Sequence, residues 1–74
     1  MDMRKIVGRN VRKYRLERGL TQEVFAERCG FAQNYLSDLE RGKRNPTIVT
    51  LWELAQALEV TPIALLADDA EGEA

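Results

Sequence analysis

The chain has 74 residues, of which 45% are hydrophobic and 31% are charged, with a formal net charge of −1 and an isoelectric point of about 5.4. A chain of this length forms one small domain, which leaves little room for a long catalytic cleft. The lack of histidine and the single cysteine, Cys29, exclude an intramolecular disulfide and a zinc site built from Cys and His ligands.

No apolar run approaches the roughly 20 residues of a membrane-spanning helix, and the first residues lack the apolar region of a signal peptide. We therefore expect a cytoplasmic protein without a membrane partner. The composition suggests neither a metal nor another cofactor, and we expect no small-molecule ligand. The sequence has no histidine, no set of metal ligands and no cysteine in a catalytic context, so an enzyme is not expected. Its acidic residues are expected on helix surfaces and in a C-terminal tail.

The charge is distributed unevenly along the chain. All eleven basic residues lie at or before position 44, together with six acidic residues, so this part carries a net charge of +5. The remainder carries six acidic residues and no basic one. Although the overall charge argues against a nucleic-acid partner, this asymmetry favours one, because it would turn the basic part towards phosphate.

The first helix is expected from Arg4 to Arg18, with Val7, Val11 and Tyr14 forming its inward stripe. Gly8 inside this helix is unfavourable by about 1 kcal/mol relative to alanine, which suggests close packing against another element. Gly19 is expected to end the helix in a left-handed conformation.

The stretch from Thr21 to Arg41 predicts two short helices joined by a tight turn. The first, Gln22 to Cys29, has Thr21 as its N-cap, and the second runs from about Ala32 to Arg41. Small Ala26, the turn residue Gly30 and the apolar Leu36 have the spacing of a helix-turn-helix. Inward positions are also assigned to Phe25, Cys29, Phe31 and Leu39, so Cys29 is interpreted as a small buried hydrophobe rather than a reactive thiol.

Thr47 is expected to cap a fourth helix, and Thr61 followed by Pro62 to begin a short fifth one ending near Ala67. The fourth helix is expected from Ile48 to Glu59, with inward positions at Ile48, Leu51, Leu54, Ala55 and Leu58. Residues 67–74 are acidic and are expected to form a disordered tail after a domain that spans residues 1–66.

Four segments together resemble the Cro/CI-type, or XRE family, helix-turn-helix domain of phage repressors and small bacterial regulators. They are GLTQ at 19–22, the frame of Ala26, Gly30 and Leu36, YLSDLERGKRNPT at 35–47, and LWELAQALEVTPIALL at 51–66. The resemblance implies an all-α, compact five-helix bundle of the phage-repressor DNA-binding type. The alternative fold interpretation is an unrelated five-helix bundle that binds no nucleic acid.

The function implied by the resemblance is a sequence-specific regulator of transcription, a repressor or autoregulator, that binds a pseudo-palindromic double-stranded DNA operator as a homodimer. A restriction-modification controller, a prophage repressor and an antitoxin are not separated by the sequence. The alternative from another class is a helical protein-interaction module, such as an antitoxin or adaptor, that binds a partner protein.

In a helix-turn-helix the second helix lies in the major groove, which sorts the candidate residues by role. Base reading is expected from Gln33, Asn34, Ser37 and Asp38. Phosphate contacts are expected from Arg12, Thr21, Gln22, Tyr35, Arg41, Lys43 and Arg44. By resemblance, Arg15 and Glu40 form a supporting ion pair between the first and third helices, with Arg15 either directed towards a phosphate or part of a surface pair. The expected dimer interface consists of Trp52, Pro62, Ile63 and Leu65.

Overall fold

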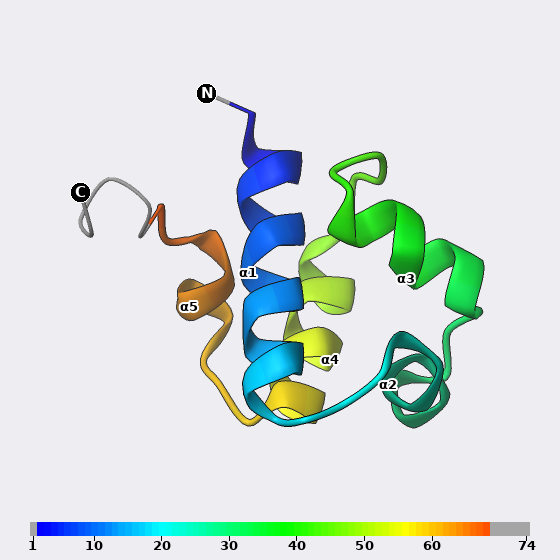
Figure 1. The fold of residues 1–74 in the computed structure, drawn as a ribbon. Helices are drawn as coiled ribbons and strands as arrows, with labels where there is room; N and C mark the ends of the chain where they lie inside the picture. Colours follow the sequence, from blue (N-terminus) through cyan, green and yellow to red (C-terminus); the bar gives the residue numbers. More distant parts are fainter. Residues whose placement is uncertain (1, 69–74) are drawn as a thin grey trace.

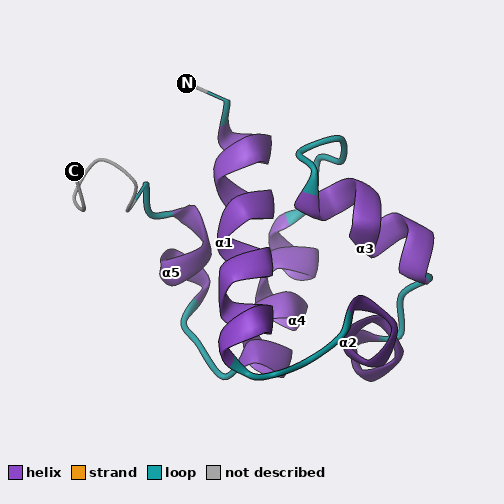
Figure 2. Ribbon diagram, in the orientation of Figure 1, coloured by secondary structure: helices purple, strands orange, loops and turns teal. Residues whose placement is uncertain are grey.

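The computed structural model describes residues 2–68, and within them it contains five α-helices and no strand (Figures 1 and 2). The helices are α1 Met3–Glu17, α2 Gln22–Cys29, α3 Gln33–Glu40, α4 Ile48–Leu58 and α5 Pro62–Leu66. The predicted all-α five-helix fold is therefore confirmed. Over the same residues, no helix is both long enough and apolar enough to cross a membrane.

Side-chain caps explain where four of the helices begin. The hydroxyls of Thr21, Thr47 and Thr61 accept hydrogen bonds from backbone N–H groups three residues later, at 3.1, 3.1 and 3.3 Å. The sequence predicted these three caps. It did not predict the cap of α1, where the Asp2 carboxylate accepts from the backbone N–H of Arg4 at 3.0 Å. Each cap satisfies a donor that the helix leaves unpaired, a contribution of about 1 kcal/mol.

The core lies where α1 passes between α3 and α5, with α4 behind it and α2 closing one end (Figure 1). Its buried apolar residues are Val7, Val11, Phe25, Ala26, Leu36, Leu39, Leu54, Ala55, Leu58 and Leu65. Most of the predicted inward positions are confirmed by this set, while Tyr14, Cys29, Phe31 and Leu51 pack against it only partly buried.

Ile48 was predicted to face inward, and this prediction is wrong, because 85% of its surface is exposed. Thr47 is the N-cap, so Ile48 is the first residue of α4 and lies a turn before the helix reaches the core. Leu51 is partly covered, and Leu54 is the first residue of the stripe that is completely buried. The inward stripe of α4 is therefore correct from Leu51 onwards, and its first residue is exposed.

Gly8 marks the closest approach of α1 to α3. A Cβ atom at this position would collide with the carbonyl oxygen of Leu39 and lie 2.8 Å from that of Glu40. Real Cβ atoms do not approach backbone oxygens so closely, and these oxygens belong to the last turn of a helix that cannot move alone. The predicted close packing at Gly8 is confirmed, and it sets the distance between α1 and α3.

Two polar side chains of α1 bond to the ends of distant helices. The buried Asn10 donates from Nδ2 to the carbonyl oxygens of Leu65 and Ala67, at 2.9 and 2.7 Å. Arg18 donates from Nε to the carbonyl oxygen of Leu58, at 2.9 Å, at the end of α4. These bonds satisfy carbonyl groups that α4 and α5 leave without helical partners. Neither role was predicted from the sequence.

The residues after α5 continue along α1 as far as they are described. Besides the bond from Asn10 to Ala67, Arg9 Nη2 lies 2.8 Å from Asp68 Oδ1. The first two residues of the predicted acidic tail therefore contact the domain. The rest of that tail, residues 69–74, lies outside the described part of the chain.

Candidate nucleic-acid interface

Helices α2 and α3 meet across a turn fixed by Gly30, which has φ +77°. The N–H of Phe31 donates to the carbonyl oxygen of Ala26 at 2.9 Å, and the N–H of Gly30 donates to that of Glu27 at 3.2 Å. This hydrogen-bonded turn joins two helices whose buried side chains include Phe25 and Leu36. The predicted helix-turn-helix geometry is present, and the two helices lie together on the side of α1 opposite α5 (Figure 1).

The first turn of α3 presents two amide side chains to solvent. Gln33 and Asn34 are both exposed, and Ser37 is partly exposed one turn later. Leu36 and Leu39 are buried on the inward side of the same helix. The first turn is free of a side-chain cap, because Ala32 stands at the N-cap position. Gln33, Asn34 and Ser37 form the outer face of α3, the surface expected to read bases.

Beneath α3 lies a buried charged network centred on Glu40. Arg15 donates from Nε to Glu40 Oε2 at 2.7 Å and from Nη2 to Oε1 at 3.0 Å. Arg15 Nη1 also donates to the carbonyl oxygen of Leu20 at 2.7 Å. Gln22 adds a bond from Nε2 to Glu40 Oε1 at 3.0 Å, so α1, α2 and α3 meet at one carboxylate.

This network revises two expectations. The side chains of Arg15 and Glu40 are only 8% and 2% exposed, so the pair is neither a surface ion pair nor a means of directing Arg15 to a phosphate. Gln22 is partly buried, and its amide nitrogen is engaged by Glu40. The supporting ion pair itself is present as expected. Its bidentate geometry fixes the orientation of α3 relative to α1.

A second charged cluster surrounds the end of α3. The Asp38 carboxylate accepts from Arg41 Nη2 at 3.0 Å and from Arg44 Nη2 at 3.5 Å. The Arg44 guanidinium also lies over the ring of Tyr35, 5.2 Å from its centroid, and that ring packs at a tilt against Phe31. Asp38 was expected to read a base, whereas here both of its oxygens accept bonds from arginines.

The other candidate phosphate ligands lie in different settings. Arg12 on α1 and Lys43 in the α3–α4 loop are exposed. Thr21 is also exposed, but its hydroxyl accepts the capping bond of α2 from Val24. Tyr35 is partly buried between Phe31 and Arg44.

The expected dimer residues differ in their exposure to solvent. Trp52 and Ile63 are 54% and 76% exposed, and Pro62 is also exposed. Leu65 is completely buried, so its assignment to the interface is corrected. Residues two apart on a helix lie on nearly opposite sides, so Ile63 faces outward while Leu65 lies on the inward side of α5. Val49 of α4, which was not assigned to this interface from the sequence, is also exposed.

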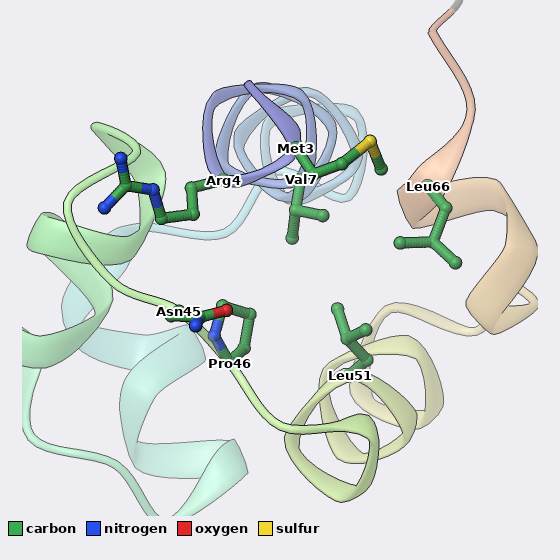
Figure 3. A pocket seen from close by; sticks show the side chains of 7 residues that line it. All are labelled: Met3, Arg4, Val7, Asn45, Pro46, Leu51 and Leu66. Atoms are coloured by element: carbon green, nitrogen blue, oxygen red, sulfur yellow. The ribbon is translucent and has the colours of Figure 1, made fainter. Parts of the chain in front are cut away.

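A pocket of about 170 Å³ opens between the starts of α1 and α4, the end of α5, and the α3–α4 loop (Figure 3). It is lined by Met3, Arg4, Val7, Asn45, Pro46, Leu51 and Leu66. Figure 3 shows Val7, Leu51 and Leu66 pointing towards one another, while the Arg4 side chain extends away from them. Its volume is below the range of about 300–1,000 Å³ that is usual for small-molecule sites.

Comparison with known proteins relates this geometry to a family. The sequence profile of the helix-turn-helix family HTH_3 matches residues 11–65. The HTH-type transcriptional regulator y4dJ of Sinorhizobium fredii is 61% identical over 66 residues, which cover 89% of this chain and 86% of that protein.

Solved structures show the same fold. The crystal structure of the hypothetical transcription factor NHTF from Neisseria superposes with a TM-score of 0.90 at 32% identity, covering 97% of this chain and 83% of that one. The biofilm regulator SinR in complex with DNA superposes with a TM-score of 0.78 at 35% identity, covering 82% of this chain and 98% of that one. This chain belongs to the HTH_3, or XRE, family of helix-turn-helix transcriptional regulators.

Proposed function

We propose that this protein regulates transcription by binding a specific double-stranded DNA operator, with α3 in the major groove. The observation that carries the proposal is the outer face of α3, where Gln33 and Asn34 are exposed on a helix held in place by the buried Glu40 network. Glutamine and asparagine amides pair with N6 and N7 of adenine, and Ser37 adds a shorter polar contact one turn later. The similarity to SinR, whose structure was solved with DNA, supports this docking.

The phosphate contacts that we propose surround this face. Lys43, Arg41 and Arg44 lie at or just after the end of α3, and Arg12 projects from α1. Thr21 and Gln22 stand at the start of α2, where backbone N–H groups favour an anion. Tyr35 adds its hydroxyl beside Arg44. These groups would fix the register of the protein on the duplex without selecting its sequence.

We further propose that the protein binds as a homodimer. One domain reads only a few base pairs, whereas a two-fold dimer places two recognition helices about 34 Å apart and thereby reads a pseudo-palindromic operator. Trp52, Pro62 and Ile63 provide exposed apolar surface on α4 and α5 for the contact between subunits. In such a dimer the protein would act in the cytoplasm as a repressor or autoregulator, by occupying DNA near a promoter.

Selection of binding sites from a random duplex pool tests this proposal. We expect enrichment of a symmetric sequence whose half-sites are about 10 base pairs apart. Failure to enrich any sequence at low salt, where phosphate contacts are strongest, would contradict DNA binding. It would favour the alternative of a protein-interaction module that uses the exposed apolar residues of α4 and α5.

Base reading is tested on the selected operator with the double variant Gln33→Ala, Asn34→Ala. Loss of bidentate contacts is expected to weaken binding by about 1–3 kcal/mol for each amide that pairs with a base. Gln56→Ala is the matched control, because Gln56 is an exposed amide on α4, outside the helix-turn-helix. If the double variant binds the operator with unchanged affinity, Gln33 and Asn34 do not read its bases.

A further inference from the structure

Asp38 is the acidic residue on the exposed side of α3. Asp38 follows Gln33 and Asn34 by about one turn, on a helix that is proposed to enter a groove lined by phosphates. A bare carboxylate at this position would repel the DNA backbone. Its two oxygens accept bonds from Arg41 and Arg44, and the side chain is 31% exposed.

The backbone after α3 brings these arginines back onto the helix. Gly42 has φ +78°, and its N–H donates to the carbonyl oxygen of Leu39 at 3.0 Å. The next N–H, that of Lys43, donates to the carbonyl oxygen of Asp38 at 2.9 Å. This pair of bonds is the Schellman arrangement, which reverses the chain at the end of a helix. Arg44 follows directly, and its guanidinium lies beside Tyr35 and Asp38 of α3.

Arg44 is held from two sides. Its Nη2 atom is 3.5 Å from Asp38 Oδ2, and its guanidinium carbon is 5.2 Å from the centroid of the Tyr35 ring. Cation–π stacking on an aromatic face and a carboxylate at the edge of the guanidinium restrict both its position and its plane. The Tyr35 ring is in turn supported by Phe31, at a centroid distance of 5.3 Å.

Two free arginines would have to lose conformational freedom when they contact DNA, and they would bind any phosphate with similar strength. Arginines that are already ordered lose less freedom on binding. This favours binding only where the duplex presents phosphates in the matching positions. The carboxylate also removes one positive charge from the contact region. It therefore weakens binding to an arbitrary duplex more than binding to a duplex that fits.

We infer that Asp38 is a positioning residue rather than a base reader: it orders Arg41 and Arg44 for the operator backbone and lowers affinity for non-specific DNA. This inference rests on the proposed function. It assigns the discrimination between operator and other DNA partly to a residue that contacts neither bases nor phosphates.

The test measures binding to the selected operator and to a scrambled duplex of equal length and composition. The proteins compared are the wild type, Asp38→Asn and Glu27→Gln. The control Glu27→Gln makes the same change in charge at an exposed position of α2. For Asp38→Asn we expect at least about threefold tighter binding to the scrambled duplex and a fall in the ratio of operator to scrambled affinity, and neither effect for Glu27→Gln.

A second comparison shows whether Asp38 acts through the arginines. Asp38→Asn is repeated in an Arg41→Ala, Arg44→Ala background, where it is expected to leave the affinity ratio unchanged. A structural role alone would not produce this dependence on the arginines. Thermal unfolding is expected to change little, because exposed ion pairs contribute little to folding stability.

Two outcomes would overturn the inference while leaving the proposed function intact. If Asp38→Asn raises affinity for both duplexes by the same factor, Asp38 is only a repelling surface charge. If its effect persists without the two arginines and changes the preference at a single base pair, Asp38 reads that base. If the wild type binds neither duplex, the proposed function and this inference are overturned together.

Discussion

Arg15 and Glu40, which are 25 residues apart in the chain, form a bidentate ion pair buried between α1 and α3. The distances are 2.7 Å for Nε to Oε2 and 3.0 Å for Nη2 to Oε1. Two further bonds, from Gln22 to Glu40 and from Arg15 to the carbonyl oxygen of Leu20, complete the network. Helix α3 is thus attached through its last residue to α1 and α2.

Removing the carboxylate is expected to cost far more than the loss of one surface ion pair. Glu40→Ala leaves the Arg15 guanidinium buried without its anion, which lowers the free energy of unfolding by about 3–5 kcal/mol. Arg9→Ala is the control, because its pair with Asp68 is 50% and 29% exposed and is expected to contribute less than about 1 kcal/mol. Urea unfolding of both variants checks the difference. Equal small losses would contradict a structural role for the buried pair.

Two glycine substitutions are expected to act through different mechanisms. Gly8→Ala places a methyl group against the carbonyl oxygens of Leu39 and Glu40, forcing α1 and α3 apart at a cost of about 1–3 kcal/mol or more. Gly19→Ala meets no atom within 4 Å but keeps φ +68°, which costs about 1–2 kcal/mol. Only Gly8→Ala should also weaken operator binding in a folded sample, because it displaces α3. Fluorescence anisotropy below the melting temperature of both variants makes this comparison.

Lys43 is expected to contribute affinity without specificity. Lys43→Ala should weaken binding to operator and scrambled duplexes by similar factors, and reduce the slope of log K against log salt by about 1. Arg28→Ala is the control. Arg28 lies in the last turn of α2 beside Trp52 and Glu53, and its removal should leave the salt slope unchanged. A salt slope that is unaffected by Lys43→Ala would remove this residue from the proposed phosphate contacts.

Neighbouring residues of α5 are expected to respond in opposite ways to substitution. Ile63→Asp should shift the protein towards monomer with little change in folding stability, because Ile63 is 76% exposed. Leu65→Ala should lower the free energy of unfolding by about 2–5 kcal/mol, because Leu65 is completely buried. Sedimentation equilibrium at several concentrations, together with urea unfolding, separates the two effects. An unchanged monomer–dimer equilibrium for Ile63→Asp would exclude this surface from the interface.

The Cys29 thiol is expected to make the folding stability fall at alkaline pH. Burial raises the pKa of the Cys29 thiol to about 11 from an ordinary value of 9.0, and the carboxylate of Glu53 adds to this shift. Between these values the unfolded chain releases the proton and the folded chain keeps it. The contribution of Cys29 to stability is therefore present below pH 9.0 and lost as the pH rises towards 11.

The measurement compares urea unfolding of the wild type and Cys29→Ala near pH 8 and near pH 10.5. All other titrating groups are the same in both proteins, so the difference between them reports on Cys29. We expect the wild type to lose more stability than the variant between the two conditions. The thiol should also react slowly with iodoacetamide near pH 8, because little thiolate is present. Fast alkylation of the folded protein would contradict the raised pKa.

Most of the local structure is predictable from sequence, because its causes lie within a few residues. The three threonine caps act on N–H groups three residues later, and Gly30 closes its turn within the same short segment. The predicted limits of α2 are confirmed, as are the starts of α4 and α5, whose ends differ by one residue. Both limits of α1 and α3 differ from the prediction by one residue. The outward position of Gln33 and Asn34 follows from the same helical periodicity that buries Leu36 and Leu39.

Tertiary structure decided what each helix meets, which periodicity alone does not specify. Ile48 and Leu65 both follow apolar patterns, but Ile48 is exposed and Leu65 is completely buried. The two carbonyl groups bonded by Asn10 are 55 and 57 residues away in the chain. Asp38 looks like a base reader on an isolated helix and becomes a partner of Arg44 only when the following loop reverses. The sequence determined five helices and the face that α3 presents, and their packing determined which polar groups on that face are already bonded.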